Sequence, residues 1–274
     1  MSGSPGNSHR QRRKQKNRRK RIRDGAFLYG KNSILERVRV NPASIRAVYY
    51  SDKCKDKGLL DRIHKKKIPL EKVTESRLTR LKKADRLQGI IARVDSFQYT
   101  PAEALIEDAA AEGRTVLCLD SINDPHNLGS ILRVTACFGN ISVVIPRYSA
   151  CEVTDTVMHV ASGGENYVPL AVVNNLAHVI TAVKENGYTV AGTIVEKGED
   201  LNTVAFPFPL CLILGSEGKG IRAGLKQHCD IAVRIYMHGA NLSFNVAVAC
   251  AIFCHEMTKQ RLQKKKRDEK TDNF

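Results

Sequence analysis

The chain has 274 residues, a net charge of +16 and a hydrophobic fraction of 42%. This length and apolar content suit one large or two modest domains with packed cores, and they exclude a wholly disordered chain. No run approaches the ~18 apolar residues of a membrane-spanning helix, so we expect no membrane segment. The excess positive charge favours a polyanionic partner, and nucleic acid is the expected one.

The positive charge is segregated along the chain. Residues 1–23 carry ten basic residues and no acidic one, residues 24–98 carry 18 against 9, and residues 259–274 carry 7 against 3. Residues 99–258 carry only 9 against 16. We therefore expect the two tails and the first domain to bind the phosphates of a nucleic acid. Because residues 1–23 have one apolar residue besides the initiator Met, we interpret them as a disordered tail, with a nuclear-import signal as the alternative.

Eight cysteines occur without any Cys-x-x-Cys pair, which predicts neither a disulfide framework nor a zinc knuckle. Cys118, Cys211 and Cys250 lie in apolar runs, where a free thiol behaves as a small hydrophobic residue. Cys250, Cys254 and His255 have helical spacing that favours packing over a metal site, so we expect no metal. A reducing cytoplasm is the simplest compartment.

Hydrophobic patterning divides the chain into two α/β domains. Residues 24–98 read as a small substrate-binding domain, with helices expected over 31–39 and 58–67 and strands over 47–50, 68–70 and 89–94. The Ala- and Glu-rich residues 99–113 suit a linker that ends in a short helix. Residues 114–258 form the second expected domain, followed by a basic C-terminal tail, 259–274.

The second domain shows uniformly apolar strands that alternate with helical patterns. The strands are expected over 115–119, 141–145, 188–192, 210–214 and 231–235. Such strands indicate a mostly parallel sheet with helices on both faces. A last helix is expected to begin within residues 237–246 and to run to about residue 262.

Three polar loops follow strand ends, where open α/β sheets bind ligands. They span residues 120–133, 214–221 and 237–246. The second is rich in glycine but lacks both the Gly-Lys-Ser/Thr ending of a P-loop and the Gly-x-Gly-x-x-Gly spacing of a dinucleotide site. Glu217 within it would repel a phosphate, so a neutral or cationic ligand fits better.

These loops resemble the three ordered motifs of SpoU-type RNA 2′-O-methyltransferases. The matching residues are Asn123-Asp124-Pro125-x-Asn127-x-Gly129 with Arg133, then Leu214-Gly215-Ser216-Glu217-Gly218-x-Gly220, then Ser243-Phe244-Asn245-Val246. Residues 27–33 and 88–90 also resemble the ribosomal-protein-like substrate-binding module of members that modify large-subunit ribosomal RNA. The resemblance implies a C-terminal trefoil knot, S-adenosylmethionine as cofactor, an RNA substrate, and a homodimer in which both subunits shape the site.

The resemblance also implies roles for individual residues. Adenosine would be held by Gly215, Ile235 and Phe244, with Thr193 and Met237 nearby. Here Phe244 and Ala247 depart from the common Ser-Leu-Asn-Val-Ser, and Ala240 and Leu242 replace hydroxyl-bearing residues of close relatives. We expect the ring of Phe244 to offset lost contacts by stacking on adenine.

The catalytic roles implied by the resemblance centre on Arg133, which would activate the ribose hydroxyl. Because a guanidinium hardly gives up its proton, we expect Arg133 to stabilise the developing alkoxide rather than to act as a base. Asn127 and Asn245 would orient Arg133 or the ribose, and Glu217 would anchor the loops or Arg133. Ser243 would hold a substrate phosphate at its helix start. The plainer readings are helix caps for Asn127 and Ser243 and an ion pair for Glu217.

The expected function is 2′-O-methylation of a guanosine in large-subunit ribosomal RNA. Two alternatives remain open: a transfer-RNA 2′-O-methyltransferase, and a non-catalytic RNA-binding assembly factor that has kept the fold and the basic tails. The presence of Arg133, Glu217, Ser243 and Asn245 argues against the non-catalytic factor.

Overall fold

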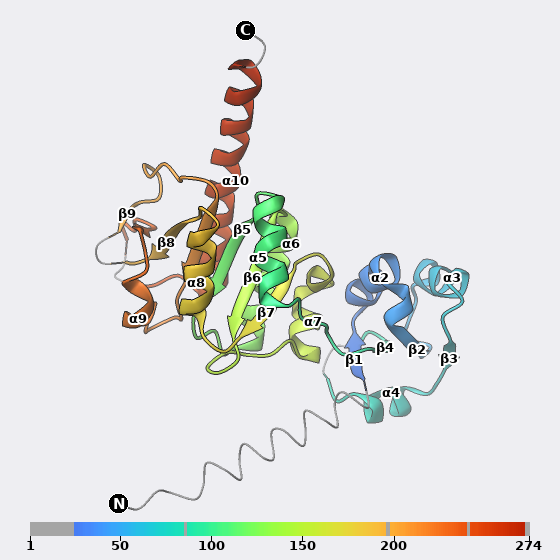
Figure 1. Cartoon of the computed structure of the whole chain (residues 1–274). Helices are drawn as coiled ribbons and strands as arrows, with labels where there is room; N and C mark the ends of the chain where they lie inside the picture. Colours follow the sequence, from blue (N-terminus) through green and yellow to red (C-terminus); the bar gives the residue numbers. More distant parts are fainter. Residues whose placement is uncertain (1–24, 85–86, 196–197, 240–241, 272–274) are drawn as a thin grey trace, which may run out of the picture. The chain divides into compact units, whose positions relative to one another are not determined.

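The computed structural model describes residues 25–84, 87–195, 198–239 and 242–271. The chain folds into two compact units, Met1–Gln98 and Tyr99–Phe274. The expected tail, 1–23, lies outside the described residues. Figure 1 shows the elements of each unit in chain order.

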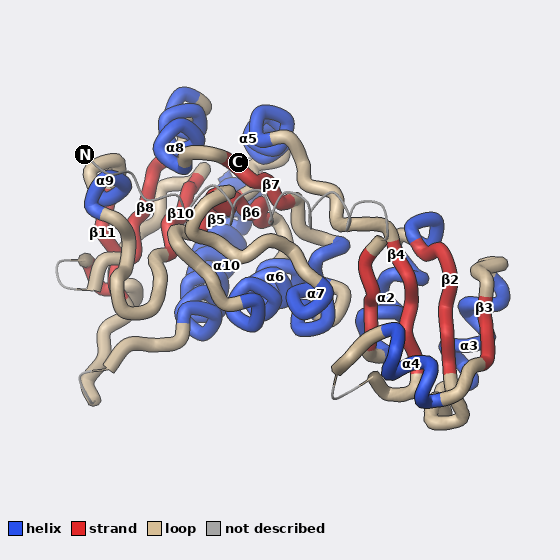
Figure 2. The backbone as a smooth tube through the Cα atoms, turned by 90° about the horizontal axis from the view of Figure 1, so that it is seen from below, coloured by secondary structure: helices blue, strands red, loops and turns tan. Residues whose placement is uncertain are grey.

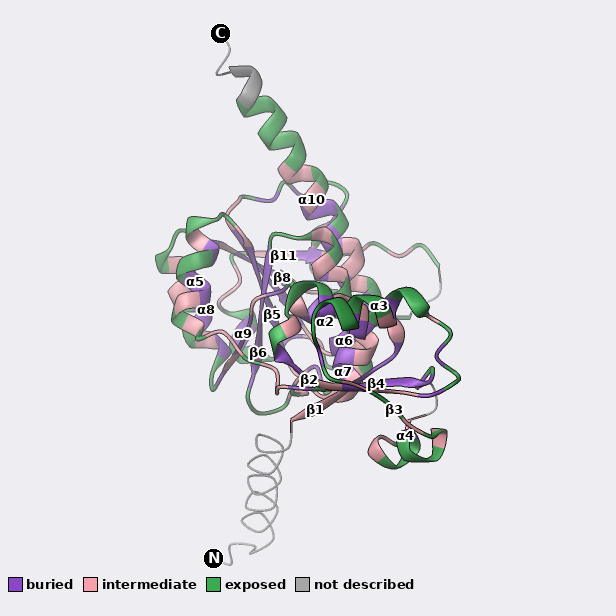
Figure 3. Cartoon of the chain, turned by 90° about the vertical axis from the view of Figure 1, so that its right-hand side faces the viewer, coloured by how far each residue is buried: buried purple, intermediate pink, exposed green. Residues whose placement is uncertain are grey.

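Unit 1 is a four-stranded sheet with helices on both faces. Its elements are β1 (Ala26–Tyr29), α2 (Lys31–Val40), η1 (Pro42–Ser44), β2 (Ile45–Tyr50), α3 (Lys57–Lys65), β3 (Leu70–Lys72), α4 (Glu75–Leu81) and β4 (Ile90–Val94). The strand order is β1-β4-β2-β3, with β4 antiparallel to β1 and β2, and β3 parallel to β2. Helices α2 and α3 cover one face and α4 the other, as Figure 3 shows.

The helices expected over 31–39 and 58–67 are confirmed, as are the strands at 47–50 and 89–94. The strand expected at 68–70 lies two residues later. Helix α4 was not expected, because its apolar side is only Leu78 and Leu81. Leu78 is nevertheless fully buried, and it packs with Tyr29 and Ile91.

Unit 2 is built on a parallel seven-stranded sheet. Its elements are α5 (Ala102–Ala111), β5 (Thr115–Leu119), α6 (Pro125–Phe138), β6 (Ile141–Pro146), α7 (Asp155–Ala161), η2 (Gly164–Asn166), β7 (Leu170–Val173), α8 (Leu176–Glu185), β8 (Thr189–Thr193), β9 (Glu199–Asp200), β10 (Leu210–Leu214), α9 (Ala223–Lys226), β11 (Ile231–Arg234) and α10 (Val246–Thr271). The strand order is β7-β6-β5-β10-β8-β11-β9, and every pairing is parallel. The five expected strands are confirmed within two residues, and β7 and β9 are additional.

Helices cover both faces of this sheet: α5 and α8 lie on one, and α6, α7 and α10 on the other (Figure 2). The first face buries Val116, Cys118 and Ile213 against α5 and α8. The segment expected as a linker, 99–113, is therefore part of the core, because α5 buries Leu105 in the same cluster.

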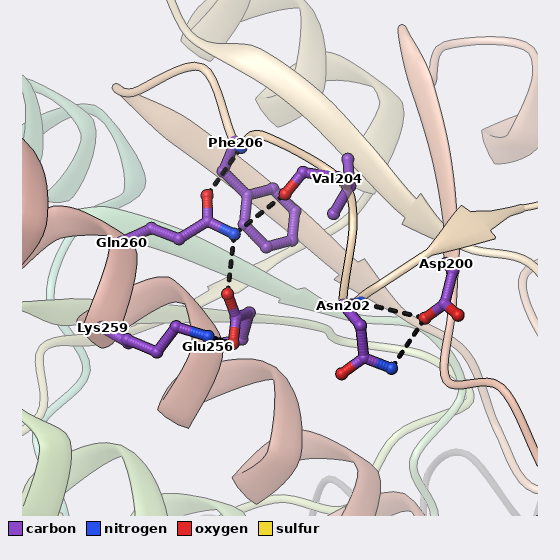
Figure 4. A network of polar contacts seen from close by, with 7 residues as sticks. All are labelled: Asp200, Asn202, Val204, Phe206, Glu256, Lys259 and Gln260. Atoms are coloured by element: carbon purple, nitrogen blue, oxygen red, sulfur yellow. Dashed lines mark hydrogen bonds and ion pairs between the residues drawn. The ribbon is translucent and has the colours of Figure 1, made fainter.

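The last helix differs most from expectation. Instead of ending near residue 262 before a tail, α10 continues to Thr271. Gln260 and Arg261 fasten it to the body. Gln260 accepts a hydrogen bond from Phe206 N and donates one to Val204 O, both at 2.9 Å, as Figure 4 shows. Arg261 donates to the carbonyl of Gly113 and to the hydroxyl of Thr115.

The crossing of α6 and α7 depends on the absence of a side chain at Gly129. A Cβ there would lie 2.7 Å from Val160 Cβ and 2.8 Å from the carbonyl oxygen of Val157. Those distances are shorter than any ordinary carbon contact, so this position sets how closely α7 approaches α6.

We predict that Gly129→Ala lowers the free energy of unfolding by about 1–3 kcal/mol, because the helices must separate to admit the methyl group. Urea unfolding measures it. Gly224→Ala in α9 is the matched control, since its Cβ would meet nothing within 4 Å. The control should leave stability unchanged or raise it by up to about 1 kcal/mol. Equal effects of the two substitutions would contradict this account of the crossing.

Candidate functional site

The three polar loops meet at the carboxyl edge of the sheet. They follow β5, β10 and β11, and parallel strands end at the same edge. Strands β5 and β10 are neighbours, and their pairing continues into the loops through a 2.8 Å hydrogen bond from Asp120 N to the carbonyl of Leu214. Residues far apart in sequence therefore become neighbours here.

The carboxylate of Glu217 joins all three loops. Its Oε1 accepts hydrogen bonds from Asn127 Nδ2 at 3.0 Å, Asn245 Nδ2 at 2.6 Å and Val246 N at 3.1 Å. Asn245 Nδ2 also donates to Asn127 Oδ1 at 2.8 Å. One acceptor thus links the start of α6, the glycine loop and the first turn of α10.

Asn245 is also the N-cap of α10, because its Oδ1 accepts from Ala247 N at 3.0 Å. Ser243 was expected at the helix start, but the helix begins at Val246, so Ser243 lies ahead of the cap. Asp124 caps α6 through His126 N at 2.8 Å, which leaves the side chain of Asn127 free to bond Glu217.

The glycines after β10 allow the loop to fold back on itself. A Cβ at Gly215 would overlap the backbone of Gly220 and Ile221, so no side chain fits there. Gly218 and Gly220 have φ angles of 78° and 62°, the left-handed region that favours glycine. The folded loop lines the cavity beside it with Gly215, Gly218 and Gly220, and also with Ser216 and Glu217.

A cavity of about 290 Å³ lies between this loop, the ends of β8 and β11, and the first turns of α10. All five residues expected at the cofactor line it: Thr193, Gly215, Ile235, Met237 and Phe244. Glu217 and Ser243 line it too, and Val246, Ala249 and Phe253 form the wall given by α10. The size is near the lower end of the range for small-molecule sites.

The residues at which the third loop departs from the family pattern have different surroundings. Phe244 is partly exposed at the cavity, whereas Ala247 is buried in the first turn of α10. Leu242 is exposed, and Ala240 lies outside the described residues. Among the departures that the structure describes, Phe244 alone lines the cavity.

Arg133 makes no hydrogen bond with the Glu217 cluster in the part of the chain that the structure describes. It is exposed, and its one hydrogen bond within the described residues is a long one, 3.5 Å, to Ser162 Oγ. Gly164 packs against its backbone, since a Cβ there would lie 2.9 Å from Arg133 Cα. Glu217 thus bonds residues of all three loops, and among the described residues no hydrogen bond or ion pair joins it to Arg133.

Asp120 is a structural residue that the sequence reasoning missed. It is fully buried, and its carboxylate accepts from Arg222 N at 2.8 Å and Arg222 Nε at 2.7 Å. The pair ties the end of β5 to the segment after the glycine loop. An acidic residue directly after a uniformly apolar strand was the available signal, because a buried carboxylate needs a partner.

Two family models match the chain. That of the SpoU rRNA Methylase family matches residues 114–255, and that of RNA 2′-O ribose methyltransferase substrate binding matches residues 27–100. The chain belongs to the SpoU rRNA methylase family. The two matched regions correspond to unit 2 and unit 1 of the structure.

Two relatives of this SpoU methylase illustrate the likeness. The 23S rRNA (guanosine-2′-O-)-methyltransferase RlmB of Nitrosomonas europaea is 34% identical, over 87% of this chain and 93% of that protein. A TrmH family tRNA/rRNA methyltransferase of Staphylococcus saprophyticus is 32% identical, over 85% of this chain and 95% of that one.

Among solved structures, the SpoU methyltransferase AviRb of Streptomyces viridochromogenes, in complex with AdoMet, has a TM-score of 0.72 at 22% identity. The match covers 89% of this chain and 94% of that chain. The expected fold class, a SpoU-type α/β domain with a small N-terminal substrate-binding domain, is thus confirmed. The protein is an S-adenosylmethionine-dependent RNA methyltransferase.

Membrane spans and metal clusters are both absent from the part of the chain that the structure describes. None of the helices there is both long enough and apolar enough to cross a bilayer. No group of three or more His, Cys, Asp or Glu side chains among the same residues is arranged to hold a metal ion.

We predict that Glu217→Ala weakens S-adenosylmethionine binding about tenfold to a hundredfold, because three donors lose a shared acceptor and the cavity wall loosens. Calorimetric titration of the cofactor measures the change. Glu217→Gln should lose less, since it keeps one acceptor oxygen. Glu185→Ala, an exposed carboxylate at the end of α8, is the control. Cofactor affinity equal to wild type in Glu217→Ala would contradict the anchoring role.

Proposed function

We propose that this SpoU methylase transfers a methyl group to the ribose 2′-hydroxyl of a guanosine in large-subunit ribosomal RNA. The observation that carries the proposal is the union of the three loops at Glu217 beside an apolar cavity. The relative RlmB, whose name gives a guanosine-2′-O activity on 23S rRNA, supports the finer target. The substrate-binding unit supports an RNA larger than the reacting nucleotide.

S-adenosylmethionine supplies the methyl group when bound. We propose that Gly215, Ile235 and Phe244 hold its adenosine, with Thr193 and Met237 beside them. The cavity fits this cofactor because it combines apolar walls with backbone groups of the folded glycine loop. Of its lining residues only Glu217 and Arg234 carry charge, one acidic and one basic, so the lining would hold the cofactor without adding net charge.

The proposed role of Arg133 is to stabilise negative charge on the ribose oxygen as its proton is lost. A guanidinium remains charged at all working pH values, so it lowers the energy of an alkoxide by charge and hydrogen bonding. Asn127 and Asn245 are proposed to position the first turns of α6 and α10 around the ribose. Ser243, exposed at the cavity, is proposed to bind a substrate phosphate.

Unit 1 is proposed to bind the body of the RNA. Eight of its lysines are exposed: Lys53, Lys55, Lys57, Lys65, Lys66, Lys67, Lys72 and Lys83. Lys82 is half-buried over the ring of Tyr29, so its charge is partly used within the unit. Exposed lysines contribute phosphate attraction without base specificity, which suits the positioning of a large structured RNA.

The second candidate is a transfer-RNA substrate, because the relative from Staphylococcus saprophyticus is named for both transfer and ribosomal RNA. A third candidate is a non-catalytic assembly factor, and the intact Glu217 cluster disfavours it. Mapping of 2′-O-methyl groups in total RNA, with and without the gene, separates the three. Loss of one ribosomal guanosine methylation is expected. Loss of a transfer-RNA methylation, or of none, would overturn the proposed target.

A homodimer is part of the proposal. Five exposed apolar side chains lie in or near the loops and first turn around the cavity: Val195, Tyr236, Leu242, Phe244 and Val248. Exposed apolar side chains gathered around a polar site favour a protein interface. Arg133 makes no hydrogen bond to Glu217, Asn127 or Asn245 among the described residues, which also favours completion of the site by a second chain.

We also propose that the protein works in the cytoplasm. All eight cysteines are free, and five of them are buried. The hydrogen bond with Cys118 and complete burial raise the pKa of the Cys211 thiol well above its usual range. Such thiols are protonated and unreactive, as suits a reducing compartment.

We predict that Arg133→Ala abolishes methyl transfer and leaves cofactor binding nearly intact, because the side chain acts on the hydroxyl and not on adenosine. Tritiated methyl incorporation and calorimetric cofactor binding are measured side by side. Arg133→Lys keeps the charge but not the planar donors, so it should restore part of the rate. Substantial turnover in Arg133→Ala would remove Arg133 from the proposed chemistry.

We predict that the active protein sediments at twice the 30.4 kDa of one chain. The physical reason is the apolar rim around the cavity, which a second chain would cover. Sedimentation velocity at the concentration of the activity assay is the measurement. An active species with the mass of one chain would rule the dimer out.

A further inference from the structure

The end of α10 extends beyond the body of unit 2, as Figures 1 and 3 show. Residues 262–268 are exposed at every position. They include four consecutive basic residues, Lys264 to Arg267, and one acidic residue, Asp268. Because these turns leave the domain, they do not contribute to the core, and packing within unit 2 does not account for their composition.

The point where this helix leaves the body is fixed from two sides. Gln260 bonds the backbone on both sides of residue 205, through Val204 O and Phe206 N (Figure 4), and it also donates to Glu256 Oε1. Arg261 bonds Gly113 O at 2.8 Å, and its guanidinium stacks over the ring of Phe208. The exposed turns therefore continue from an anchored helix rather than from a loose end.

The pattern of side chains favours a polyanion over other partners. Successive residues step by about 100° around a helix, so four consecutive cations face all sides. A helix that docks on a protein or lies on a membrane needs an apolar face, and Leu262 is the one large apolar residue within 262–268. Favourable interaction with the helix dipole extends over the last turn alone and does not account for the cluster.

The same helix also forms part of the cofactor cavity. Val246, Ala249 and Phe253 line it at one end of α10, and at 1.5 Å per residue Lys265 lies roughly 28 Å along the axis from Val246 and roughly 18 Å from Phe253. We propose that residues 262–268 are a rigid arm that binds the RNA backbone at a fixed distance from the reacting ribose. This inference rests on the proposed function and adds to it a surface on which the substrate is aligned.

The first test replaces the four cations with glutamine in the full-length chain (K264Q/K265Q/K266Q/R267Q). Filter binding to labelled bacterial large-subunit rRNA over a salt series measures RNA affinity. Each lost phosphate contact lowers the log–log salt slope by about 0.7–0.9, so four lost contacts should lower it by roughly 3. Cofactor affinity and thermal stability should match wild type. An unchanged slope would overturn the arm, and loss of binding to phosphatidylserine vesicles instead would assign the cluster to membranes.

The second test separates a rigid arm from a mobile one. Insertion of Gly-Gly-Ser-Gly between Leu262 and Gln263 keeps every charge but uncouples the cluster from the anchored helix. We expect rRNA affinity and its salt slope to remain close to wild type, while kcat/KM for methyl transfer falls by about tenfold or more through misalignment. Wild-type kcat/KM in this variant would overturn the fixed distance. RNA binding and methyl transfer are measured separately. A protein that binds rRNA but never methylates it would therefore contradict the proposed function without contradicting RNA binding by the arm.

Discussion

The hydrogen bonds accepted by the Glu217 carboxylate are the interaction on which the rest of the site depends. They join side chains 90 and 28 residues away in sequence, and Asn245 closes the triangle to Asn127 across 118 residues. A carboxylate is suited to this task because it only accepts, whereas amides and backbone N–H groups supply donors. The sheet places the three loops at one edge, and the hydrogen bonds to Glu217 fix their positions relative to one another.

The hydrogen bond from Val246 N to Glu217 also fixes the start of α10. Val246 N is one of the donors left unpaired at the start of a helix, and Glu217 satisfies it from another loop. The helix that begins there lines the cavity with Val246 and Phe253, and it is held again, fourteen residues after Val246, by Gln260. The helix that forms this wall is therefore held both at Val246 and at Gln260. We expect a substitution at Glu217 to change how α10 is positioned along the cavity.

The sequence allowed the central strands to be predicted because their composition is local information. Residues 115–119 and 210–214 are short, almost uniformly apolar runs, which is the pattern expected of a strand covered on both faces. That these two strands are neighbours in the sheet was not predictable, because neither run contains information about the strand with which it pairs. The extension of α10 past residue 262 was missed for another reason: its cationic turns have no apolar periodicity, and their helicity follows from continuity with an anchored helix.

The site residues show the same division. The resemblance to the family predicted that Thr193, Met237 and Phe244 lie at the cofactor, and all three line the cavity. The position of Asp120 directly after an apolar strand indicates that its carboxylate needs a partner, but that partner, Arg222, lies 102 residues away and no local pattern identifies it. Gly129 belongs to a family motif, but in the structure a glycine is needed there because α7 packs closely against α6.

The distribution of charge along the chain is consistent with separate regions for cofactor binding and for the proposed RNA binding. Among the described residues that line the cavity, one acidic and one basic side chain carry charge, Glu217 and Arg234, so the lining has no net charge. Phosphate attraction acts over several ångströms and needs no close fit, so it can be supplied from exposed positions of unit 1 and from the end of α10. The proposed attraction for RNA thus comes from cations that do not line the cavity. Segregated charge is thus the physical condition under which one chain can bind a polyanion and a cationic cofactor together.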